Sequence, residues 1–178
     1  MNSEHIMREW FGAVRTAADK AAAMPDSTVL SEVSRRKVSM LLRQYLYDTL
    51  ESRIIQIEEI PSAEAGKMCK EIYTELMEDI IAGVWSTEEN MEIAMFLYEC
   101  KNGVTDDNTF RMLTEKAFGK NIASDTTKKL QEEARRELDL FCEHRKKQNL
   151  LKKTKLRDEN EPPQGLDEFE YIDWMITH

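Results

Sequence analysis

The amino-acid sequence predicts an all-α fold: a bundle of about six helices, followed by a linker and an acidic, aromatic C-terminal tail. Apolar residues recur every three or four positions along almost all of the chain, and the period-two alternation of a β-strand is not sustained. Glycine and proline are scarce, and they fall between the helical stretches. The residues that divide the chain in this way are Pro25, Pro61, Gly83, Gly103 and Gly119.

The first two predicted helices lie on either side of Pro25. Residues 3–23 form the first, with one apolar face made by Ile6, Trp10, Val14 and Ala17. Residues 28–59 keep apolar steps of three and four along their length, which predicts a single long helix. Its stripe consists of Val33, Val38, Leu41, Leu42, Tyr45, Leu46, Thr49, Leu50, Ile54 and Ile57.

Three further helices are predicted in the middle of the chain. Residues 63–82 form the third, because apolar residues recur there at every fourth position. A capping box made by Ser86 and Glu89 begins a fourth helix over residues 86–99. A shorter fifth helix follows over residues 105–118 and ends before a glycine.

The sixth predicted helix begins at Ser124 and defines the end of the folded domain. Its apolar stripe consists of Leu130, Ala134, Leu138 and Phe141. We expect the helix to continue to about Leu156, because no helix-breaking residue intervenes. The Pro162-Pro163 pair cannot lie inside a helix and predicts a linker. The chain therefore divides into a helical domain over residues 1–157 and a docking tail over residues 158–178.

The charge of the chain reverses between its last two segments. Residues 145–157, called the basic segment, hold seven basic residues and no acid. Residues 158–178, called the acidic tail, hold seven acids and neither lysine nor arginine. The basic segment contains Arg145, Lys146, Lys147, Lys152, Lys153, Lys155 and Arg157. These seven side chains are the candidate contacts to nucleic acid, because phosphates attract clustered cations.

The acidic tail also carries large apolar side chains. They include Leu166, Phe169, Tyr171, Ile172, Trp174 and Met175. Leaving such groups in water costs free energy, so the tail is expected to dock rather than to stay disordered, either on the basic segment of its own chain or in the groove of a partner. These six residues are the candidate partner-binding site.

Two functional hypotheses follow from this charge pattern. The first is a non-enzymatic protein-protein interaction or regulatory subunit that docks a protein partner through the acidic tail. The alternative is a nucleic-acid-associated factor that uses the basic segment, with the tail as an intramolecular competitor. A net charge of −9 disfavours nucleic-acid binding by the whole surface, so any such binding would be local to that segment.

The sequence contains no motif for catalysis, for a cofactor or for a metal. Phosphate-binding loops, dinucleotide-binding glycine patterns and paired-histidine zinc motifs do not occur. The one compact reactive cluster is Cys142-Glu143-His144, and residues two apart on a helix point in different directions. Zinc takes about four ligands. The prediction is therefore a protein without catalytic residues, cofactor or metal.

Cysteine content and hydropathy favour an intracellular location without a membrane partner. There are three cysteines, an odd number that is widely spaced and does not suggest a disulfide framework. Reduced thiols are typical of the cytoplasm and the nucleus. No apolar run is long enough to span a membrane.

Residues 50–58 resemble the end of the long helix in the GINS replication subunits. The segment reads Leu-Glu-Ser-Arg-Ile-Ile-Gln-Ile-Glu, and the family has a leucine, then an arginine, an apolar residue and Ile-Glu. A helix over residues 62–79 also follows, as it does in that family. The resemblance implies a DNA replication accessory subunit. The small β domain of the family has no counterpart, since residues 86–157 predict helix.

Overall fold

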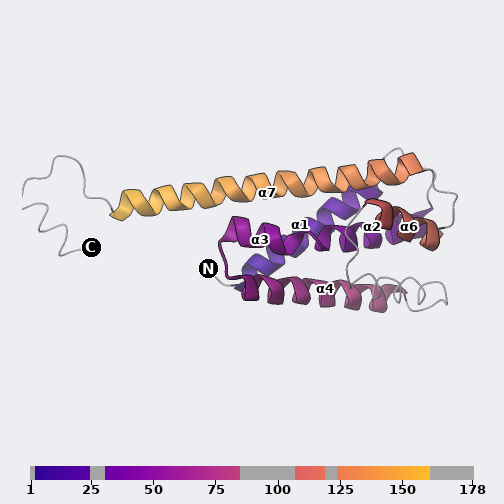
Figure 1. The fold of residues 1–178 in the computed structure, drawn as a ribbon, viewed down its shortest axis with the longest axis horizontal. Helices are drawn as coiled ribbons and strands as arrows, with labels where there is room; N and C mark the ends of the chain where they lie inside the picture. The colour runs from indigo at the N-terminus through magenta and orange to yellow at the C-terminus, as the bar shows by residue number, and fades with distance from the viewer. Residues whose placement is uncertain (1–2, 25–30, 85–106, 119–123, 161–178) are drawn as a thin grey trace, which may run out of the picture.

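The computed structural model describes residues 3–24, 31–84, 107–118 and 124–160 (Figure 1). Within these ranges the chain forms six helices and no strand, which confirms the predicted all-α fold. None of the helices in the described part of the chain is long and apolar enough to span a membrane.

The helices form a bundle in which α7 lies opposite α4, with α2 and α3 between them (Figure 1). The α1 helix packs against α2, α4 and α7 and so joins the two sides. The end of α7 extends past the other helices (Figure 1). The bounds are α1 Ser3–Ala22, α2 Glu32–Tyr47, α3 Leu50–Glu58, α4 Ser62–Val84, α6 Asp107–Phe118 and α7 Ser124–Asn160.

The core is built from the apolar stripes that the sequence predicts. In α1 the stripe from Ile6 to Ala17 is buried, and Trp10 is completely enclosed. Trp10 meets Phe141 of α7 edge-on, with 5.2 Å between the ring centres, a geometry that favours aromatic pairs. In α7 the side chains of Leu130, Ala134 and Leu138 are buried as well. Helical periodicity therefore identified the faces that pack together.

The prediction of one helix over residues 28–59 is wrong, because the described part of this stretch forms two helices, α2 and α3. The break lies at Asp48 and Thr49. Both the hydroxyl and the backbone N–H of Thr49 donate to the Leu46 carbonyl, at 3.0 and 3.3 Å. A continuous helix would pair that carbonyl with the N–H of Leu50, so the turn competes with the helix. Leu50 and Ile54 stay fully buried beyond the break, and the apolar pattern therefore gave no sign of it.

The corner between α3 and α4 directs two acidic residues toward α7. Glu59 closes α3 in the left-handed conformation, with φ of 54°, and its N–H donates to the Ile55 carbonyl at 3.1 Å. The Pro61 carbonyl then accepts the N–H of Glu64 at 3.0 Å and begins α4. Glu58 and Glu59 both contact side chains of α7 from this corner.

Several predicted elements lie outside the described residues. They are the helix predicted over residues 86–99, the linker and most of the acidic tail. The α7 helix continues to Asn160, so it includes the first residues of the predicted tail.

Candidate functional site

The α7 helix has a packed part, residues 124–149, and a projecting end, residues 150–160. Every side chain from residue 150 to residue 156 is exposed, although the backbone remains helical. Among them are three leucines, Leu150, Leu151 and Leu156, whose exposed fractions are 63%, 63% and 58%. Apolar groups presented this way on a helix gain free energy when another surface covers them.

The exposed leucines lie on two faces of the helix. Leu151 follows Leu140 by eleven residues, about three turns, so the two share a face, and Leu140 is 55% exposed. Leu156 lies about two turns beyond Asn149, and Asn149 contacts the bundle. Leu156 thus continues the face of α7 that packs on the bundle at Asn149, but no other helix in the described part of the chain covers it there.

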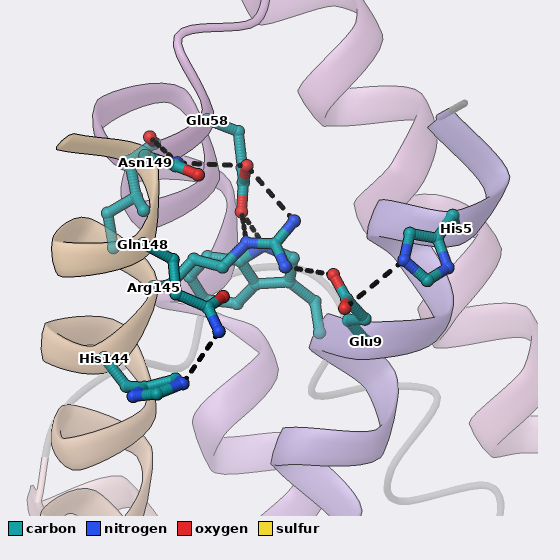
Figure 2. A network of polar contacts seen from close by, with 9 residues as sticks. His5, Glu9, Glu58, His144, Arg145, Gln148 and Asn149 are labelled. Atoms are coloured by element: carbon teal, nitrogen blue, oxygen red, sulfur yellow. Dashed lines mark hydrogen bonds and ion pairs between the residues drawn. The ribbon is translucent and has the colours of Figure 1, made fainter. Parts of the chain in front are cut away.

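Arg145 lies at the centre of a buried polar network, which Figure 2 shows. Its exposed fraction is 4%, and the Glu58 side chain that faces it is 1% exposed. The Arg145 Nε donates to Glu58 Oε1 at 2.5 Å and its Nη2 to Glu58 Oε2 at 3.4 Å. Its Nη1 is paired with Glu9 of α1. The guanidinium therefore joins α7 to both α1 and α3.

Further hydrogen bonds complete this network around Glu58. Trp10 Nε1 donates to Glu58 Oε1 at 3.1 Å. Asn149 Nδ2 donates to the Ile57 carbonyl at 2.8 Å and to Glu58 Oε2 at 3.4 Å (Figure 2). A buried carboxylate is tolerated when its charge is paired and its oxygens are hydrogen-bonded, and Glu58 meets both conditions.

The pKa of Arg145 reflects the same surroundings. Burial alone lowers the pKa of a guanidinium, but the hydrogen bonds and charges of Glu58 and Glu9 outweigh it and raise the pKa above its usual value. Arg145 is therefore charged at every physiological pH.

The structure separates Arg145 from the other predicted nucleic-acid contacts. Arg145 is buried within the chain, so its guanidinium does not face a ligand. The exposed lysines of the basic segment are Lys146, Lys147, Lys152, Lys153 and Lys155. Lys153 pairs with Glu59 at 2.5 Å on the surface. The side chain of Arg157 and the six predicted tail residues lie outside the described part.

Glu9 and Glu58 were not among the predicted site residues, although the sequence held one signal. Arg145 follows Leu138 by seven residues, about two turns of helix. It therefore lies on the same face as the apolar stripe of α7, where a cation needs a buried acid. The spacing could not identify that acid, because Glu58 is 87 residues away.

Two of the cysteines, Cys69 and Cys142, lie in the core. Burial raises the pKa of Cys69 to about 12, so its thiol stays protonated at neutral pH. Cys142 is buried too, and its pKa is raised by burial even though Arg53 Nη1 donates to its sulfur at 3.2 Å. Its neighbours Glu143 and His144 are exposed, so these three side chains do not converge. Within the described ranges no group of acids, histidines and cysteines could hold a metal ion.

No protein-family model, curated protein or solved structure matches the chain. The resemblance to GINS subunits is thus confined to the residues that carry it. Those residues form α3, a helix of nine residues, and not the end of a long helix.

Proposed function

We propose that the protein is a non-enzymatic interaction subunit that binds a partner protein through the projecting end of α7 and the acidic tail. The observation that carries this proposal is the exposure of Leu150, Leu151 and Leu156 on a helix that extends past the bundle. Amphipathic helices commonly bind by placing such residues in the apolar groove of a partner.

The chemistry of the projecting end specifies the partner's surface. Leucines supply the apolar contact, and exposed lysines such as Lys152 and Lys155 lie beside them. Interfaces usually combine an apolar centre with a polar rim of complementary charge. The expected partner therefore offers an apolar groove with carboxylates along its rim.

Site-specific photo-crosslinking in cells tests the proposal. A photoreactive residue at position 151 of the full-length chain is expected to form an adduct with a distinct protein. The matched control carries the same residue in place of Glu75, which is exposed on α4. Adducts confined to the chain itself, or the same adducts from both positions, would contradict the proposal.

Once the partner is captured, Trp174→Ala tests the contribution of the tail. An aromatic anchor at an interface commonly contributes about 2 kcal/mol or more, so affinity should fall at least about thirtyfold. Isothermal titration calorimetry measures the change, with Thr177→Ala as the control. An unchanged affinity would show that Trp174 does not contribute to the interface.

The second candidate function, nucleic-acid binding, is favoured by the exposed lysines of the basic segment. Fluorescence anisotropy can compare the full-length protein with a chain ending at Arg157, which lacks the acidic tail. If the tail competes for the lysines, removing it should create tight binding that weakens steeply with salt. Equally weak binding by both chains would reject this function.

A further inference from the structure

An arginine-rich pocket lies on a different part of the molecule, between α1, α2 and α4. Its volume is about 490 Å³, and Arg15, Arg35, Arg36 and Arg43 contribute to its lining. The rest of its lining consists of two carboxylates, Asp19 and Asp79, together with Ser39 and three apolar residues, Ala22, Ala23 and Met40. The arginines come from two helices that pack against each other.

The positive charges in this pocket outnumber the negative ones. Arg43 Nη2 pairs with Asp19 Oδ1 at 2.9 Å, and Arg15 pairs with Asp79. Ser39 also donates to Asp19 Oδ1, at 2.5 Å, which fixes that carboxylate at the pocket wall. Both lining acids are thus already engaged.

Arg35 has no acid of its own in the described part of the chain. Its neighbour Arg36 instead pairs with Glu32 at 2.9 Å, on the open surface. The pocket therefore keeps an excess of positive charge that the described residues do not neutralise.

Three donors around the pocket also lack an acceptor. The Nε atoms of Arg15, Arg35 and Arg43 are buried, and none has a hydrogen-bond partner among the described residues. A buried N–H without an acceptor is unfavourable, and such groups in folded proteins usually have a protein, water or ligand partner. Here three of them belong to arginine side chains that line the same pocket. This differs from the Arg145 network, in which the nearby acids satisfy the guanidinium.

We infer that this pocket binds the phosphate group of a small phosphorylated molecule. A phosphate carries nearly two negative charges at neutral pH and has several acceptor oxygens. Guanidinium groups match those oxygens with paired donors. The volume falls within the range of about 300–1,000 Å³ usual for small-molecule sites, so it can hold an organic part as well as the phosphate. This inference does not depend on the projecting end of α7.

The binding test uses full-length protein with inorganic phosphate, adenosine monophosphate and adenosine as probes, at constant ionic strength. Isothermal titration calorimetry should detect saturable binding of at least one phosphate-bearing probe and no binding of adenosine. Tighter binding of adenosine monophosphate would indicate an organic phosphate, and equal binding would indicate the free anion. If neither phosphate-bearing probe binds, or adenosine binds equally well, the inference is overturned.

Arg35→Gln tests whether the pocket is the place of binding. The affinity for phosphate should fall about tenfold or more, because a charged hydrogen-bond donor is lost. The matched control is Arg8→Gln, an exposed arginine of α1 that pairs with Glu4 away from the pocket. Equal loss in both variants, or no loss in Arg35→Gln, would overturn the assignment.

A second measurement needs no variant and so does not depend on variant folding. Phenylglyoxal modifies arginines, and mass spectrometry locates each modified position. Phosphate should slow the modification of Arg35 and Arg43 in the wild-type protein and leave Arg8 unaffected. Unchanged modification of Arg35 at saturating phosphate would contradict the site.

Discussion

The packed part of α7 and its projecting end belong to one continuous helix, yet they are stabilised differently. In the packed part, Leu138 is buried and Arg145 is surrounded by acids of two other helices. In the projecting end, Leu150 and Leu151 are mostly exposed. Helical stability in proteins comes mainly from tertiary packing, so continuity alone does not stabilise the second part. Among the described residues, the projecting end therefore lacks the apolar tertiary packing that stabilises the rest of the helix.

The largest expected effect concerns Arg145→Met, which tests the packed part. It leaves the Glu58 charge buried without a partner and should lower the free energy of unfolding by about 3–5 kcal/mol. Urea denaturation followed by circular dichroism measures the loss. The double variant Arg145→Met with Glu58→Leu should recover most of it, because an apolar pair can replace a buried ion pair. A single variant as stable as wild type would show that the network contributes little.

The same substitution in both parts of α7 gives the most direct comparison. Leu138→Ala opens a cavity in the core and should cost about 2–5 kcal/mol. Leu151→Ala removes an exposed side chain and should change stability by less than about 0.5 kcal/mol. Equal effects in thermal unfolding of the isolated protein would mean that the projecting end is packed in solution.

Asp48 extends the comparison to a half-buried carboxylate that lacks the neighbours of Glu58. Burial raises the pKa of Asp48 from 3.8 to about 7. The folded state therefore disfavours ionisation, and stability should fall as the pH rises from about 4 to 7. Asp48→Asn should be more stable than wild type by about 2 kcal/mol at pH 8, a value reduced from the full linkage because Asp48 is only partly buried.

The control for Asp48→Asn is the stability of both proteins near pH 3.5. There the carboxyl is protonated in the folded state and mostly protonated in the unfolded state, so the two curves should nearly converge. Parallel curves between pH 4 and 8 would contradict the raised pKa of Asp48.

A smaller effect is expected at the corner that contacts α7 just beyond its packed part. Glu59→Gly relieves a left-handed conformation that glycine adopts readily, so stability should rise by up to about 1 kcal/mol. The lost ion pair with Lys153 is exposed on both sides and contributes little. Lys153→Gln, measured by chemical denaturation, isolates that contribution and should have almost no effect. A clear loss from Lys153→Gln would show that α7 is held by this pair.

The helix faces could be predicted from the sequence because burial follows a local period. Trp10, Val14 and Leu138 all occupy the stripes that the spacing indicates. The break at Thr49 could not be predicted in this way, since the apolar residues continue in register through it. The turn there is closed by hydrogen bonds from the Thr49 hydroxyl and N–H to the Leu46 carbonyl, and these bonds do not change the hydrophobic pattern.

The candidate sites were less predictable, because they depend on distant residues. Charge density grouped Arg145, which is buried, with the lysines of the basic segment, which are exposed, and could not separate them. The pocket brings together Arg15, Arg35 and Asp79, which belong to three helices. Only the packing of those helices determines that their side chains converge. The spacing of residues along the chain therefore does not predict that these side chains meet.

The pairing of Glu58 with Arg145 has a consequence for synthesis on the ribosome. The acid is made 87 residues before the arginine that neutralises it. The interval is longer for Glu9, which is made 136 residues before Arg145. Before α7 has been translated, burying Trp10 and Glu58 would leave the Glu58 carboxylate buried without a cation to pair with. Burying an unpaired charge is strongly unfavourable. The N-terminal helices are therefore expected to stay loosely associated during translation, and α7 should complete the domain in a late step.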